Sequence, residues 1–151
     1  MTDVSTITTR IVALTGDISG VSAVDDEYPD TLTTLPFCFV EEGPAAFVKS
    51  NTNNIICTQE FTLLLYVQQF ETEITGQEDA AYQACRPFLT SVPTFFWQHT
   101  RLQRNDQGLA DIVTASLTEH QGIQSASRNN KEYMGIAFTL NVVYDQYIDE
   151  V

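Results

Sequence analysis

The sequence predicts a single α+β domain over residues 1–151, in which a mainly antiparallel sheet of four or more strands is packed on one face by an N-terminal helix and a broken middle helix. Three observations lead to this prediction. Apolar residues recur at helical spacing near the N-terminus, proline interrupts a second stretch of helical composition, and residue types alternate near the C-terminus. The expected order is helix, strand, strand, broken helix, strand, strand, without an internal repeat or a domain linker.

The N-terminal segment, residues 4–16, is predicted to form an amphipathic helix. Its apolar residues are three or four positions apart, which places them on one face: Val4, Ile7, Ile11, Leu14 and Ile18. Either Thr2 or Asp3 is placed to cap the first turn, because a side-chain oxygen there accepts a hydrogen bond from an amide that has no carbonyl partner. Gly16 and Gly20 indicate where the helix ends.

Two strands are expected between the helices. The apolar residues 37–40 predict a short buried strand that follows Pro36. Residues 44–54 are rich in Asn, Ser and Thr, a composition typical of either a loop or the tip of a long hairpin. Residues 55–70 are rich in β-forming types and apolar on both faces at their centre, which predicts an inner strand of the sheet.

The middle of the chain, residues 77–96, has helical composition. Its broad apolar face consists of Ala80, Ala81, Ala84, Cys85, Phe88, Leu89 and Val92. Pro87 has no amide hydrogen to donate to the preceding turn, so it is expected to break this stretch into two helices or to kink it. Pro93 is expected to repeat the interruption for the same reason.

Two further strands are predicted in the last third of the chain. Residues 111–119 alternate, which places Val113, Ala115 and Leu117 on one side. The final strand alternates over a greater length, with large apolar residues at every second position: Met134, Ile136, Phe138, Leu140, Val142 and Tyr144. We expect its first four large residues in the core, and Thr139 and Asn141 outside it.

The charge balance disfavours several classes of partner. Seven basic residues stand against twenty acidic ones, which leaves a formal net charge of −13. Such a surface repels phosphate, so neither tight nucleic-acid binding nor binding to an anionic membrane is expected. It is compatible with surrounding DNA without gripping it, because like charge discourages adhesion. No signal-peptide pattern or membrane-spanning stretch occurs, so we expect the protein to remain in the cell that makes it.

No motif for catalysis, a metal or a cofactor stands out, so we expect neither enzymatic activity nor a bound cofactor. Cys38, Cys57 and Cys85 have apolar or small neighbours, which is typical of reduced thiols inside a core. His99 and His120 are far apart and lie in no metal-ligand spacing. The acidic segment 25–30 lacks the alternating ligands, central Gly and distal Glu of a calcium loop, which favours a solvated loop.

The aromatic cluster after the middle helix leaves two interpretations open. Phe95, Phe96 and Trp97 are adjacent in sequence, a pattern that favours core side chains together with an interface anchor. The alternative is a platform on which nucleic-acid bases stack, an idea to which the nearby Arg101 and Arg104 lend some support.

Four stretches, taken together, resemble a known family. They are the N-terminal helix leading to Ile18-Ser19-Gly20-Val21, the loop Tyr28-Pro29-Asp30-Thr31-Leu32 before Leu35-Pro36-Phe37, the helical Arg86-Pro87-Phe88-Leu89 continuing to Leu102 and Gly108, and the strand entry Tyr133-Met134-Gly135-Ile136-Ala137-Phe138. Their order over nearly the whole chain resembles the tail terminator (tail completion) proteins of long-tailed bacteriophages. None of the four is a chemically diagnostic motif.

The resemblance implies a subunit that forms a ring, usually a hexamer, on the end of the tail tube. Such a ring stops growth of the tube and joins the tail to the head, so its partners are copies of itself, the major tail tube protein and a neck or connector protein. It is assembled in the host cytoplasm and resides in the virion at the tail–neck junction, where DNA passes through. The family has no catalytic residues to transfer. The alternatives are a head–tail connector (neck) subunit and, outside this class, a small-molecule-binding or enzymatic α+β domain.

The few cations are the candidates for subunit or partner contacts, because a net charge of −13 opposes self-association. Those in or near turn-like sequence are Arg101, Arg104, Arg128, Lys131 and Lys49. The alternative is that these are solvated loop charges, since exposed ion pairs contribute little.

Overall fold

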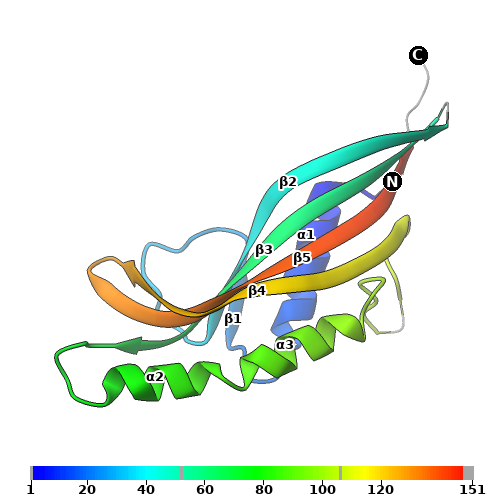
Figure 1. The fold of residues 1–151 in the computed structure, drawn as a ribbon. Coiled ribbons are helices and arrows are strands. Elements are labelled where there is room, and N and C mark those ends of the chain that lie inside the picture. Colours follow the sequence, from blue (N-terminus) through cyan, green and yellow to red (C-terminus); the bar gives the residue numbers. More distant parts are fainter. Residues whose placement is uncertain (1, 52, 106, 148–151) are drawn as a thin grey trace.

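The computed structural model describes residues 2–51, 53–105 and 107–147 and contains one five-stranded sheet with three helices (Figure 1). The elements in chain order are α1 (Val4–Gly16), β1 (Ala23–Asp25), β2 (Phe37–Asn51), β3 (Asn54–Phe70), α2 (Gln77–Cys85), α3 (Phe88–Trp97), β4 (Ile112–Arg128) and β5 (Lys131–Tyr147). The strand order is β1-β2-β3-β5-β4. Only the β1–β2 pair is parallel, so the predicted α+β class and the mainly antiparallel sheet are confirmed.

One face of the sheet provides most of the core. In the register of the central strands, Leu63 of β3 lies opposite Phe138 of β5, and Phe61 lies opposite Leu140. Buried side chains of all three helices belong to the same hydrophobic cluster as this face. Burying each large apolar side chain stabilises the fold by about 1.5–3 kcal/mol. The prediction that Met134, Ile136, Phe138 and Leu140 lie in the core is confirmed.

A second, smaller cluster lies apart from this core. It consists of Leu32, Phe37, Phe39 and Tyr133, with Tyr66 packed against it. Phe37 and Phe39 alternate along β2 with Cys38 and Val40, which belong to the main core, so the two clusters lie on opposite faces. The chain between β1 and β2 therefore contributes to the core through Leu32, a role that its acidic composition did not indicate.

Helix α1 begins and ends where the sequence indicates. Asp3 is the residue that caps it, because its carboxylate accepts hydrogen bonds from the amide and the hydroxyl of Thr6, both at 2.8 Å. Thr2 instead donates its hydroxyl hydrogen bond to the carbonyl of Ala110, which ties the N-terminus to the segment before β4.

The prediction for Pro87 is confirmed and that for Pro93 is wrong. Helix α2 ends at Cys85 and Pro87 caps α3, a position where its missing amide hydrogen costs nothing. Pro93 lies inside α3 without ending it. Its ring is buried, so packing offsets the backbone hydrogen bond that this residue is unable to donate.

The strands are longer than predicted, and β1 was missed. Residues 45–51 are exposed yet pair with β3, so the hairpin interpretation of residues 44–54 is the better one and the strand predicted over 37–40 ends too early. β4 likewise continues to Arg128 instead of stopping at residue 119. In both cases the side chains are mostly polar or exposed, so no apolar pattern marks the strand. Cross-strand hydrogen bonds keep the backbone extended there.

Val113 lies on the side of the sheet opposite to the predicted one, whereas Thr139 lies on the predicted side but is buried there. A register shift between Ile112 and Thr114 turns Ile112 into the core and leaves Val113 53% exposed, so the prediction that Val113 shares a side with Ala115 and Leu117 is wrong. Thr139 is buried because β5 is an inner strand, on which Thr62 and Glu119 flank it from both neighbours. It belongs to neither hydrophobic cluster, so the prediction that Thr139 lies outside the core is confirmed, although the residue is buried.

Candidate functional site

The three thiols lie inside the protein. Cys38, Cys57 and Cys85 are all free and buried. Burial raises the pKa of Cys38 to about 12 and that of Cys85 to about 11, because a thiolate loses its hydration there. Neither thiol has the low pKa and the exposure that a cysteine nucleophile needs.

The two histidines occupy separate places. His99 follows α3, where its Nδ1 lies 2.6 Å from the carbonyl oxygen of Phe95 and its ring stacks on that of Phe95. His120 lies in β4, and its Nδ1 accepts a hydrogen bond from the amide of Gly122. Within the described part of the chain, no three His, Cys, Asp or Glu side chains come together as a metal site requires.

The aromatic cluster at the end of α3 is split between core and surface. Phe96 is fully buried, Phe95 is half-buried against it, and Trp97 is 62% exposed. The indole nitrogen of Trp97 donates a hydrogen bond to the carbonyl of Leu117, which fixes the ring against β4. One exposed ring, hydrogen-bonded to a strand, fits an interface anchor better than a platform for successive bases.

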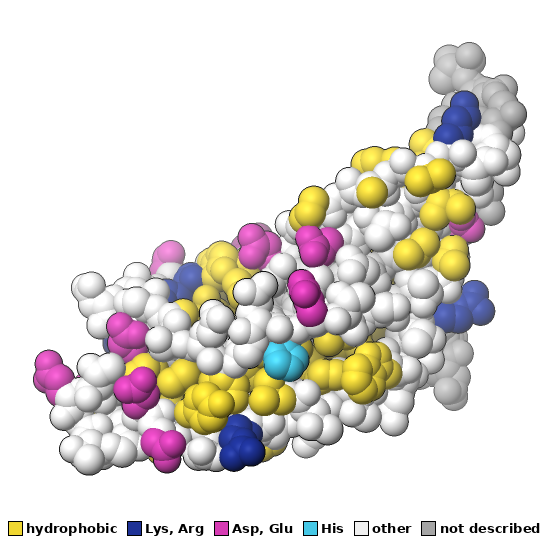
Figure 2. Space-filling model, in the orientation of Figure 1, with side chains coloured by type: hydrophobic (Ala, Val, Ile, Leu, Met, Phe, Trp, Pro, Cys, Tyr) yellow, Lys and Arg dark blue, Asp and Glu magenta, His cyan; other side chains and the backbone are white. Residues whose placement is uncertain are grey.

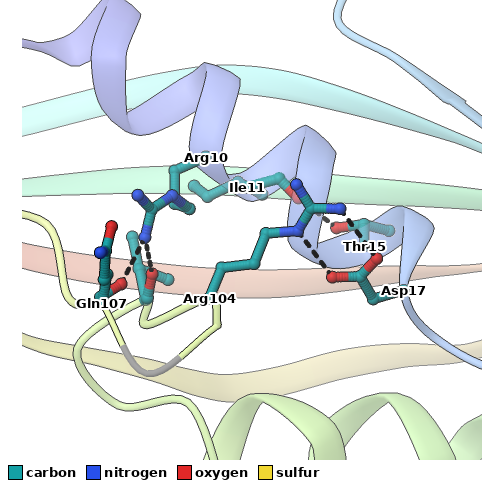
Figure 3. Close-up of polar contacts among 7 residues, drawn as sticks. Arg10, Ile11, Thr15, Asp17, Arg104 and Gln107 are labelled. Atoms are coloured by element: carbon teal, nitrogen blue, oxygen red, sulfur yellow. Dashed lines mark hydrogen bonds and ion pairs between the residues drawn. The ribbon is translucent and has the colours of Figure 1, made fainter.

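Arg104 is paired within the chain. Its guanidinium donates two hydrogen bonds to the carboxylate of Asp17, at 2.8 and 3.2 Å (Figure 3). The bond from Arg104 lowers the pKa of Asp17. Beside it, Arg10 donates to the carbonyls of Leu102 and Gln107, so two arginines tie α1 to the segment between α3 and β4.

Arg128 also has internal contacts. Its guanidinium lies 4.2 Å from the centre of the Tyr28 ring and donates a hydrogen bond to the carbonyl of Pro29. The neighbouring Asn129 donates to the carbonyl of Asp30. The turn between β4 and β5 is thereby fastened to the acidic segment that precedes β2. Tyr28 in turn stacks on Phe39, with ring centroids 3.7 Å apart.

The remaining predicted interface cations are exposed. Lys131 lies opposite Arg128 at the start of β5, Arg101 lies just after α3, and Lys49 lies near the end of β2. No side-chain hydrogen bond or ion pair to these three is found among the described residues. The five predicted residues therefore occupy three separate places: the β4–β5 turn, the segment after α3, and the end of β2. Among them, Arg128 and Lys131 form a cross-strand pair between β4 and β5.

The sheet projects beyond the helices at one end, in a segment that we call the arm: residues 45–51 of β2 and 54–56 of β3 (Figure 1). Every residue from 45 to 51 is exposed, and Phe47 and Val48 are 62% and 64% exposed. The base of the arm is held by Gln59, whose amide donates to the carbonyl of Gly43 at the irregularity between Glu42 and Ala45. The arm is therefore an ordered hairpin with little core of its own.

A shallow hollow lies at the opposite end of the molecule, beside α2. It is lined by Gly76, Glu78, Asp79, Tyr82 and Met134, and Tyr82 is 43% exposed. Glu78 and Asp79 lie in the first turn of α2, where the helix dipole stabilises negative charge. Figure 2 shows hydrophobic side chains gathered along α2 and α3, and acidic ones most frequent around the α2 end.

These apolar surface residues were not apparent from the sequence. Phe47 and Val48 lie in a segment whose Asn and Ser residues are typical of a loop. Two neighbouring residues with high β-propensity, in a stretch from 45 to 51 that contains no Gly or Pro, were nevertheless a signal of a strand. Tyr82 was left out of the predicted helix face, and its exposure depends on where β5 passes α2.

Comparison of the chain with models of known protein families and with curated proteins found no match. Among the described residues, no helix has both the length and the hydrophobicity needed to cross a membrane.

Proposed function

We propose that this protein is a structural subunit that forms a ring, caps the tail tube of a long-tailed bacteriophage, ends its polymerisation and joins the tail to the head. The observation that carries the proposal is the position of exposed apolar residues at both ends of one subunit. Phe47 and Val48 project at the arm, whereas Tyr82 and Trp97 lie on the surface formed by α2 and α3. Large exposed apolar groups at separate sites are typical of a subunit that contacts other proteins.

The mode of growth of a tail tube requires such a subunit. Tube subunits add head to tail, a heterologous contact that continues as a filament unless the growing end is occupied. A ring that matches the tube on one side and offers no copy of it on the other ends growth by binding alone. The proposed partners are therefore further copies of the chain, in a hexamer on the family resemblance, together with the major tail tube protein and a neck or connector protein.

The arrangement of the subunit fits a ring. We infer that α1 and α2–α3 pack on one face of the sheet, because their buried residues share one cluster with that face. The other face is covered near the start of β2 by the cluster that contains Leu32 and Tyr133. The rest of that face and the arm are available for contacts with neighbouring subunits and with the tube.

The charge of the chain agrees with a passage for DNA. A net charge of −13 in each subunit makes a ring strongly negative, which keeps DNA from adhering to its wall. Arg104 and Arg128 have internal partners, and the exposed Lys49 and Lys131 lie in separate places, so these cations do not combine into a basic patch that holds phosphate. In this proposal the protein acts in the virion at the tail–neck junction, after assembly in the host cytoplasm.

Removing the gene from the phage and imaging the products by electron microscopy tests the proposal. Over-long tubes without heads, beside filled heads, are the expected result. Tails of normal length that fail to join heads would favour the head–tail connector subunit, which shares the ring and the exposed surfaces. Normal particles would contradict both functions.

A further inference from the structure

We propose that the arm of one copy docks into the hollow beside α2 of the next copy, and that this contact forms the ring. The inference rests on the proposed function, since it names the subunit contact of the ring. In it, Phe47 covers Tyr82, and Lys49, which lies on the same face of β2 as Phe47, lies against Glu78 and Asp79.

The outer strand of the arm lacks burial of its own. Residues 45–51 are all exposed, and the two largest apolar side chains among them are more than 60% exposed. Residues 45–51 form the outer strand here, because residues 54–56 pair with β5 on their other side, and no helix among the described residues covers this end of the sheet. Phe47 and Val48 point to opposite faces, and a partner that covers Phe47 removes apolar area from water on one of them.

Arm and hollow carry opposite charge. Lys49 is the only charged residue in residues 45–56 of a chain with a net charge of −13. Asp145 of β5 lies opposite Ile56, on the face of Val48, so the positive charge belongs to the face with Phe47 and Lys49. Residues 71–85 contain Glu71, Glu73, Glu78 and Asp79 and no cation. Arm and hollow therefore attract each other, whereas most other pairs of surfaces on two copies repel.

The positions of arm and hollow allow the contact to repeat from copy to copy. The arm and α2 lie at opposite ends of the molecule (Figure 1). A contact between two different patches is heterologous, so each copy keeps a free arm on one side and a free hollow on the other. Repetition of this contact produces a closed ring when the rotation between copies closes, as a terminating ring requires.

Edge-to-edge pairing of β4 explains assembly less well. The amide of Ala115 already donates to the carbonyl of Thr100, and the carbonyl of Leu117 already accepts from Trp97. The outer edge of β4 is thus partly occupied inside the subunit, at the level where the exposed Val113 lies. Within the described part of the chain, the outer edge of residues 45–51 has no such backbone partner.

A charge-exchange experiment tests the contact. Purified full-length protein is measured by light scattering and native mass spectrometry over a range of concentrations, with thermal unfolding as a check that each variant folds. Phe47→Ser and Lys49→Glu should each raise the concentration at which the oligomer dissociates by about tenfold or more. Combining Lys49→Glu with Glu78→Lys and Asp79→Lys should restore assembly. Val113→Ser and Lys131→Glu are the matched controls outside the contact and should assemble as the wild type does.

The outcomes separate this inference from the proposed function. A wild-type oligomer that Phe47→Ser and Lys49→Glu leave unchanged would overturn the arm contact while the ring stands. Failure of the exchanged charges to restore assembly would overturn the hollow as its partner. A wild-type protein that is monomeric at all concentrations would overturn both. Assembly through the arm without any effect on tails in the gene-removal experiment would overturn only the proposed function.

Discussion

The guanidinium of Arg128 lies 4.2 Å from the centre of the Tyr28 ring, although the two residues are a hundred positions apart in the chain. The same side chain donates to the carbonyl of Pro29, and Tyr28 stacks on Phe39. This contact fastens the turn between β4 and β5 to the segment that precedes β2, and it covers the smaller cluster. An arginine predicted for a subunit contact therefore has a role inside the fold.

Replacing Arg128 should destabilise the fold. Arg128→Ala removes a cation–π contact and a hydrogen bond, so we expect the free energy of unfolding to fall by about 1–2 kcal/mol. Lys131→Ala, its exposed cross-strand neighbour, is the matched control and should change it by less than about 0.5 kcal/mol. Urea unfolding measures both. Equal effects of the two substitutions would contradict the internal role of Arg128.

Adding a methyl group at Gly135 should destabilise the sheet strongly. A Cβ atom there would fall well inside the contact distance of the carbonyl oxygen of Leu65 on β3, beside the register shift between Tyr66 and Gln68. Because backbone must move, we expect Gly135→Ala to cost about 2 kcal/mol or more. Gly108→Ala, where the new methyl group makes only ordinary contacts, is the control. A Gly135→Ala protein as stable as this control would refute the close approach of the two strands.

The Asp17–Arg104 pair should make a pH-dependent contribution to stability. The bond from Arg104 lowers the pKa of Asp17 in the folded state, so its contribution is fully present above the unfolded value of about 3.9 and is lost as pH falls through the lowered folded value. The wild type should thus exceed Asp17→Asn in stability at neutral pH and lose this advantage in acid. Both side chains are over 40% exposed, so salt should weaken the effect. Glu73→Gln is the control, and an advantage that grew in acid would contradict the pairing.

The three cysteines should resist thiol reagents in the folded protein. All are buried, and the raised pKa values of Cys38 and Cys85 keep those two thiols protonated at pH 8. A colorimetric thiol assay should detect almost no reaction before unfolding and three thiols per chain in guanidinium. Rapid labelling of any one thiol in the native protein would show that the core is open at that position.

Arg101 remains a candidate for a subunit contact because its side chain has no bonded partner among the described residues. Arg101→Glu alone should weaken the oligomer, and Arg101→Gln should weaken it less, because the neutral side chain adds no repulsion. Reversing Arg104 as well would also break its pair with Asp17, so the single substitution is the cleaner test. Light scattering over a salt series measures both variants. An unchanged mass for Arg101→Glu would place this residue among the solvated loop charges.

The sequence predicts the elements in which a side-chain pattern and the backbone structure agree. Phe138 and Leu140 are two positions apart on β5, and Ile7 and Ile11 are four positions apart on α1. The burial of these side chains was therefore predictable from the spacing of apolar residues alone. Pro87 was informative because it lies between two helices. Pro93 was misleading because the cost of a proline depends on packing around it, which no local pattern contains.

The parts that could not be predicted depend on contacts between distant segments. The three residues of β1 form a strand only because β2 runs beside them, and residues 45–51 remain extended only because β3 pairs with them. Arg104 and Arg128 have turn-like neighbours in sequence, so their partners Asp17 and Tyr28 were not apparent. The surface formed by Phe47, Val48 and Tyr82 likewise becomes visible only when the arm and α2 are placed in space.

The central claim, a terminating ring between tail and head, is tested most directly by locating the protein in intact virions. Electron cryo-microscopy of particles with the subunit labelled by a specific antibody fragment makes this measurement. The account predicts a single ring of label at the junction between the tail tube and the neck. Label distributed along the tube or confined to the far tip of the tail, or virions that lack the protein, would contradict it.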